Sequence, residues 1–145
     1  MKYDDASWHY GADGFPTSSP EEYGAVHIAL FLRWCFQKGW AGELHLSEEP
    51  DAVKQVIHGE MSAVDFFFKY CDGKLTNEDF DENGNKFAAK YYGEKGYYLI
   101  DFMKLLGERA YCVAENEINY GQYSAILDKR YSNGKLQRSN WKFWE

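Results

Sequence analysis

A nearly uninterrupted apolar segment, residues 25–36, limits the folds open to this chain more than any other feature. Only His27 and Arg33 are polar within it. The preceding residues 19–22 (Ser-Pro-Glu-Glu) have the pattern of a capped helix start with proline in the first turn, and Gly39 follows as a stop signal. A helix that is apolar on every side is buried on every side. The segment therefore predicts a central helix around which the rest of the chain packs.

Further helix signals follow along the chain, and the fold class they indicate is mainly α. We expect a single domain over residues 1–145, a bundle of about five or six helices around the buried central helix, with a few short extended segments. The first 18 residues are expected to be irregular. The predicted helices cover 47–59, 62–72, 76–92 with an interruption at Gly84, 97–106 with a strand as the alternative, and 117–131; 43–46 and 111–113 are predicted to be extended.

Charge is distributed unevenly between the body and the C-terminus. Residues 1–128 carry 11 basic and 22 acidic side chains, a net charge of −11, whereas residues 129–145 carry five basic side chains and one acidic side chain, a net charge of +4. An acidic body repels nucleic acid and attracts basic proteins. Residues 135–145 form a basic aromatic tail. The sequence is compatible both with a tail that docks on the acidic body and with a tail that is free. No partner nucleic acid is predicted.

Motifs for catalysis, metal binding or membrane insertion are missing from the sequence. No apolar run is long enough to span a membrane, and the N-terminus has no apolar leader, so we expect a cytoplasmic protein. The three cysteines form no CxxC motif, and all of them lie in apolar sequence typical of buried thiols. The segment from Asp79 resembles the first half of an EF-hand loop, but Lys90 stands where calcium needs a carboxylate. No catalytic residue, metal or cofactor is predicted.

The histidines offer the main alternative, an enzyme. His27 lies in the central helix and is interpreted as a hydrogen-bonded core residue. His9 follows Asp4, Asp5 and Ser7, which allows a Ser–His–Asp arrangement on paper, although geometry and not composition defines such a site. A small enzyme of unknown chemistry that uses His9 or His45 therefore stays as one alternative. A self-associating structural or regulatory protein, dimerising through the tail, is another.

Several strings resemble a family of small uncharacterised bacterial proteins, similar to the immunity proteins encoded beside polymorphic toxins. They are Lys2–Tyr10, Ala25–Ile28, Phe31–Cys35, Gly39–His45, Cys71–Thr76 and Phe87–Tyr92. The resemblance covers most of residues 2–131 and implies no enzymatic activity and no assigned site residues. It implies a cytoplasmic protein that binds a cognate toxin, which we expect to be a basic protein such as a nuclease.

Aromatic content and acidity are compatible with that function. Aromatic residues make up 19% of the chain, and Tyr and Trp are common anchors in protein interfaces. An acidic inhibitor can cover the basic active-site cleft of a nuclease. The candidate binding residues are acidic or aromatic residues in predicted loops, where binding residues concentrate. They are Asp4, Asp5, Trp8, Glu43, Asp72, Asp79, Asp81 and Glu82.

Overall fold

The apolar segment forms helix α2, Val26–Gln37, in which every residue from Val26 to Phe36 is buried. The computed structural model describes residues 1–12, 15–16, 19–106 and 111–134. The helix starts later than predicted, because Glu21–Gly24 forms a separate 3-10 helix, η1. Pro20, which precedes η1, makes no side-chain cap. A β-carbon on Gly24 would lie 3.1 Å from the backbone nitrogen of Tyr10. The chain therefore turns tightly against the N-terminal segment before α2 can begin.

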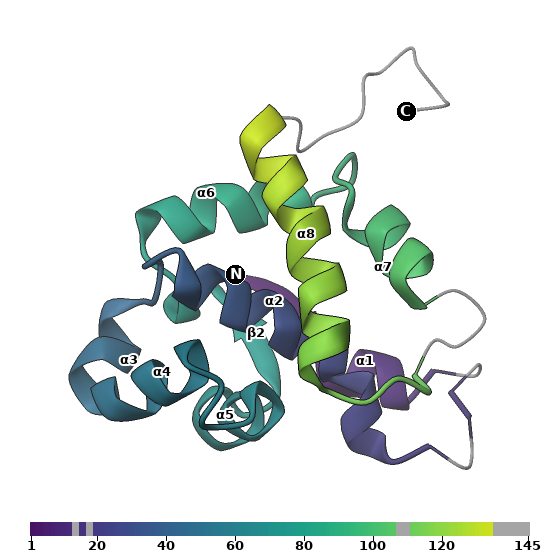
Figure 1. Ribbon diagram of the computed structural model, residues 1–145, viewed down its shortest axis with the longest axis horizontal. Coiled ribbons are helices and arrows are strands. Elements are labelled where there is room, and N and C mark those ends of the chain that lie inside the picture. The colour runs from purple at the N-terminus through teal and green to yellow at the C-terminus, as the bar shows by residue number, and fades with distance from the viewer. Residues whose placement is uncertain (13–14, 17–18, 107–110, 135–145) are drawn as a thin grey trace.

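Three helices pack directly on α2, as the prediction of a central helix requires. They are α4 (Pro50–Ile57), α5 (Ala63–Cys71) and α8 (Glu117–Asn133). Figure 1 shows α8 lying across α2. Two predicted signals are confirmed: Ser62 caps α5 by accepting from the backbone N–H of Asp65, and Gly134 ends α8 in the left-handed region at φ 65°.

The prediction of an irregular N-terminus is wrong. Lys2–Asp5 forms strand β1 and Ala6–Tyr10 forms helix α1. The strand pairs antiparallel with β2, Lys74–Thr76, with Asp4 opposite Leu75. The backbone N–H of Ala6 also donates to the carbonyl of Gly73 at 2.9 Å. A partner about seventy residues away supplies these bonds, which explains why local sequence signals did not reveal them.

Other expectations are corrected by local packing. Residues 43–46, predicted to be extended, belong to helix α3, Glu43–Glu48, in which His45 alone is buried among exposed neighbours. The capping box of Thr76 and Asp79 exists, but it opens a 3-10 helix, η2 (Asn77–Asp79), and the following helix α6 (Glu82–Tyr91) is capped by Asp81. Gly84 lies in the first turn of α6 without interrupting it.

Residues 97–106 are confirmed as helical, in α7 (Tyr98–Leu106). The described residues thus form a mainly α fold with one two-stranded sheet. Cys35 and Cys71 are buried, whereas Cys112 is exposed, contrary to expectation. Within the described ranges, no helix is long and apolar enough to cross a membrane. The tail, residues 135–145, and the question of whether it docks lie outside the described residues.

Candidate functional site

Asp4, His9 and His27 lie close together, and we call these three residues the histidine cluster. They come from β1, α1 and α2, respectively. His9 Nε2 lies 2.8 Å from Asp4 Oδ1, and His27 Nε2 lies 3.8 Å from Asp4 Oδ2. The two imidazole rings meet edge to face, with centroids 4.4 Å apart and planes at 81°. Residues of three separate elements thus direct polar atoms to one point.

Two tyrosines surround the histidine cluster and hold its polar groups. Tyr98 of α7 donates its hydroxyl to Asp4 Oδ2 at 2.8 Å. The hydroxyl of Tyr111 lies 2.8 Å from His9 Nδ1. Tyr111 has φ 65°, in the left-handed region that non-glycine residues rarely adopt. Burial raises the pKa of Asp4, but the hydrogen bond with His9 and the two nearby imidazoles outweigh it, so that this pKa lies below its ordinary value.

His27 is a core residue, as expected, but it is not hydrogen-bonded. Its side chain is 1% exposed, and neither ring nitrogen has a hydrogen-bond partner among the described residues. Burial, reinforced by the neighbouring His9, lowers the pKa of His27 to about 3, so the ring is neutral at physiological pH. A buried polar group without a partner costs about 1–3 kcal/mol. A polar side chain at this place therefore needs an explanation that core packing does not give.

The Ser–His–Asp arrangement considered from the sequence does not form at His9. The Ser7 hydroxyl donates to Asp5 Oδ1 at 2.7 Å, and Asp5 also caps α1 through the backbone N–H of Ser7. Both ring nitrogens of His9 are instead occupied by Asp4 and Tyr111. The hydroxyl of Ser7 thus helps to start a helix and does not face a base.

A second buried histidine, His45, lies between two carboxylates. His45 Nδ1 is 2.5 Å from Glu49 Oε1, and Nε2 is 2.7 Å from Asp79 Oδ1. The other oxygen of Asp79 accepts from the backbone N–H of Thr76. Burial lowers the pKa of His45, but the hydrogen bonds with Asp79 and Glu49 outweigh it, so that the pKa lies above 6.5. The ring of His45, bonded at both nitrogens, joins α3 to η2.

Stability should therefore depend on pH through His45. Because its folded-state pKa lies above 6.5, its contribution is fully present below pH 6.5 and is lost as the pH rises through the folded-state value. We expect His45→Gln to lower the free energy of unfolding more at about pH 6 than at about pH 9, measured by urea denaturation. The matched variant at the exposed His58 should change little at either pH, and an equal cost of His45→Gln at both would contradict the assignment.

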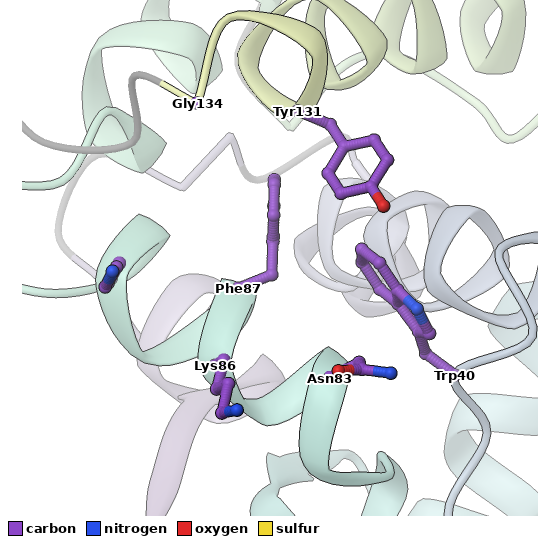
Figure 2. A pocket seen from close by; sticks show the side chains of 7 residues that line it. Trp40, Asn83, Lys86, Phe87, Tyr131 and Gly134 are labelled. Atoms are coloured by element: carbon purple, nitrogen blue, oxygen red, sulfur yellow. The ribbon is translucent and has the colours of Figure 1, made fainter.

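A groove of about 400 Å³ opens between α6 and α8 (Figure 2). Figure 2 shows Trp40 and Phe87 beneath Tyr131, with ring centroids 5.3 Å and 6.3 Å from that of Tyr131. Lys86 and Lys90 belong to the same lining. Among its described lining residues, the lysines are the only charged groups. An aromatic wall beside ammonium groups favours contact with anionic or aromatic groups over acid–base chemistry.

The eight predicted partner-binding residues are not equally accessible. Asp4, Asp5 and Asp79 are 3%, 6% and 4% exposed, because their carboxylates accept hydrogen bonds inside the fold. These three therefore do not form the exposed acidic loops that the sequence suggested. The other five are at least partly exposed. They are Trp8, Glu43, Asp72, Asp81 and Glu82.

The structure divides these residues between two places. Asp72 lies beside Asp5 at a shallow hollow near α1, where Lys2 and Lys74 form ion pairs with the two carboxylates. Glu43 lies elsewhere, near η2 and the start of α6, because Ala41 pairs antiparallel with Phe80. The hollow near α1 is thus partly neutralised, and the strongly acidic surface lies around α3.

That surface, which we call the acidic face, combines α3 with η2 and the start of α6. Leu44 and Leu46 are each 46% exposed there. Glu82 forms an ion pair with Lys86 at 3.4 Å, whereas Glu43, Glu48 and Glu78 have no ion pair with any described residue. The acidic face consists of Glu43, Leu44, Leu46, Glu48, Glu78 and Glu82, all exposed.

Sequence reasoning found part of this arrangement. Glu43 and Glu82 were identified, but Glu48 and Glu78 were missed because they were predicted to lie in helices and not in loops, and the two leucines were missed because residues 43–46 were predicted to be extended. The histidine cluster was missed because Asp4, His9 and His27 have no regular spacing. A buried histidine in an otherwise apolar helix was the only signal for it.

The fold and these sites define a mainly α domain with an exposed acidic face and a buried histidine cluster. The chain belongs to the family described as a domain of unknown function, DUF7832, whose sequence model matches residues 2–115. The match includes the histidine cluster and the acidic face and ends before α8. No curated protein and no solved structure matches the chain.

Proposed function

We propose that this protein binds and neutralises a cognate bacterial toxin domain, as an immunity protein does. The observation that carries the proposal is the acidic face, where three carboxylates without ion pairs to described residues lie on α3 and η2 together with two exposed leucines of α3. Concentrated charge of one sign attracts an oppositely charged protein and speeds its encounter. The apolar side chains would then be buried against the partner.

A basic nuclease domain is the partner that best suits this face. A nuclease must present a basic cleft to hold the phosphate backbone. Carboxylates on α3 and η2 can pair with such a cleft and prevent nucleic acid from entering it. This mode of inhibition needs shape and charge but no reaction centre, and the net charge of −11 over residues 1–128 extends the attraction beyond the contact itself.

The state of the nucleophiles and bases also favours binding over catalysis. Burial and the nearby Asp81 raise the pKa of Cys35, and burial together with Asp79 raises that of Cys71, so these thiols stay protonated. His45 is fully buried between two carboxylates. An enzyme that uses His9 would have to release that ring from Asp4 or Tyr111 first.

Charge reversal of the acidic face tests the proposal. The variant carries Glu43→Lys, Glu48→Lys and Glu78→Lys, and the intact protein and the variant each serve as bait in extracts of the native organism. We expect the intact protein to retain a basic protein in stoichiometric amount. At low salt, the purified partner should associate with the intact protein about tenfold or more faster than with the variant.

A matched control separates this face from overall charge. Glu21, Glu22 and Glu60 are also exposed and lie away from α3, so changing all three to lysine alters the net charge equally. The control should keep most of the association rate of the intact protein. Equal losses in both variants, or an unchanged rate for the variant of the acidic face, would rule out this face as the binding surface.

A further inference from the structure

His27 is the observation in the histidine cluster that hydrogen bonding and packing leave unexplained. Both of its ring nitrogens are buried without a hydrogen-bond partner among the described residues, although the rest of the cluster is thoroughly bonded. An apolar side chain would fill the same space in α2 without leaving polar atoms unpaired. A neutral imidazole has a lone pair on one ring nitrogen, so the unpartnered ring points to a ligand that accepts this lone pair.

The geometry around His27 fits a metal ion. One ligand atom each from Asp4, His9 and His27 lies within 4.8 Å of the others. A zinc ion bound at about 2.0–2.1 Å with tetrahedral angles separates its ligand atoms by about 3.3 Å. His9 Nε2 lies 2.8 Å from Oδ1 of Asp4, and His27 Nε2 lies 3.8 Å from its other oxygen, Oδ2, so both imidazoles face the same carboxylate. Small side-chain rotations would bring one ligand atom of each residue to the spacing that a bound zinc ion requires.

We propose that Asp4, His9 and His27 bind a divalent transition-metal ion of the zinc class. Two imidazoles and a carboxylate form a ligand set that suits zinc and neighbouring transition metals better than magnesium or calcium, which prefer oxygen ligands. The ion ties β1 and α1 to the central helix α2. This inference is independent of the proposed toxin binding.

The two tyrosines occupy the positions of outer-shell groups. With Nε2 of His9 on the metal, Nδ1 carries the ring proton and donates it to the hydroxyl oxygen of Tyr111, which lies 2.8 Å away. Tyr98 donates to the carboxylate of Asp4 at the same distance. Such partners set the orientation of metal ligands, and their loss weakens metal binding about 10–100-fold. The side chain of His9 is 14% exposed, which gives the ion a route into the site.

The group formed by His45, Cys71 and Asp79 has similar composition, but it does not meet the requirements for a metal site. Its atoms also lie within 4.8 Å of one another. However, both ring nitrogens of His45 already face carboxylates, and burial together with Asp79 keeps the thiol of Cys71 protonated. A metal ion there would have to displace bonds that are already made. In the histidine cluster, in contrast, neither ring nitrogen of His27 has a hydrogen-bond partner among the described residues, so its lone pair is available to a metal ion.

Metal titration of the full-length protein tests the inference. The chelator-treated protein is dialysed against Zn²⁺ or Co²⁺. We expect elemental analysis to find one equivalent of bound metal per chain, and we expect the metal to raise the thermal unfolding midpoint. The visible spectrum of the cobalt form should lack a thiolate band. Tyr111→Phe should weaken binding about 10–100-fold, whereas Tyr3→Phe, which removes a hydroxyl bonded to Asn85 outside the cluster, should not.

His27→Leu distinguishes metal binding from a structural role. The variant removes the orphaned nitrogens, so without metal it should be at least as stable as the natural protein, yet it should lose the bound equivalent and the metal-dependent rise in midpoint. The exposed His58, replaced by glutamine, is the control and should retain both. Retention of one equivalent by His27→Leu, a cobalt–thiolate band from Cys71, or binding lost only in His58→Gln would overturn the proposal.

Discussion

Replacing Phe31 with alanine is expected to lower the free energy of unfolding by about 3–5 kcal/mol. Phe31 lies in the middle of α2 and is 0% exposed. Its ring stacks on Tyr91 at 5.6 Å and meets Tyr92 edge to face at 5.3 Å, so it joins α2 to α6. Truncation leaves a cavity that close-packed neighbours fill only partly. Such a loss is a large part of the total stability of about 5–15 kcal/mol for a domain.

Phe68→Ala provides the matched control. Phe68 lies on α5 and is 39% exposed, so its truncation removes less buried surface and leaves no closed cavity. Urea denaturation of the three proteins measures the difference. A cost at Phe31 no larger than that at Phe68 would contradict the central position assigned to α2.

The second large effect is expected at Asp101, which is fully buried in α7. It accepts from Arg130 twice, at 3.0 Å and 2.7 Å, and from the hydroxyl of Tyr91 at 2.8 Å. Arg130 also lies over the ring of Tyr97 at 3.6 Å. Asp101→Asn leaves the guanidinium of Arg130 without its counter-charge. Removing one member of a fully buried pair costs about 3–5 kcal/mol, and because the side chain of Arg130 is 19% exposed we expect a cost toward the lower end of that range. Because α8 lies beyond the residues matched by the family, this contact fastens the C-terminal helix to the family domain.

Asp128→Asn, which changes a carboxylate on α8 itself, is the control for the change in charge. Asp128 is exposed and accepts from the indole N–H of Trp34 at 2.9 Å, a bond that asparagine can still accept. Its surface ion pair with Lys38 is worth about 1 kcal/mol or less. Denaturation followed by hydrogen exchange of α8 measures both variants. If Asp101→Asn cost no more than Asp128→Asn, the buried ion pair would not be what holds α8.

Local signals predicted the helices whose ends are determined by local chemistry. Ser62 caps α5 through a hydrogen bond three residues ahead, and Gly134 ends α8 with a backbone conformation that glycine adopts readily. The burial of α2 was predicted because an apolar surface all around a helix has no other stable position. In each case, the information lies within a few neighbouring residues.

The elements that the sequence did not reveal depend on distant partners. β1 exists because β2 pairs with it, and residues 2–5 alone carry no strand pattern. Residues 43–46 were predicted to be extended, but His45 bonds to Glu49 and Asp79 from within helix α3. Ser19 lacks a capping role because the close approach of Gly24 to α1 interrupts the helix. Tertiary contacts outweigh local preference at all three places.

The same reasoning explains why the candidate sites were only partly predicted. Acidic residues in loops were chosen as binding residues, but Asp79 caps η2 and Asp4 accepts from Tyr98, so burial removed both from the surface. The histidine cluster forms because α1 places His9 beside Asp4 and α2 places His27 close to both residues. Spacing in the sequence carries no trace of that arrangement.

Suppression of growth arrest tests the proposed neutralisation most directly. The basic protein retained by the intact chain is expressed in a test bacterium, alone and together with this protein or with the variant reversed at Glu43, Glu48 and Glu78. We predict that the partner alone arrests growth, that the intact protein restores it, and that the reversed variant does not. A partner that leaves growth unaffected, or arrest that persists with the intact protein present, would contradict the proposed function.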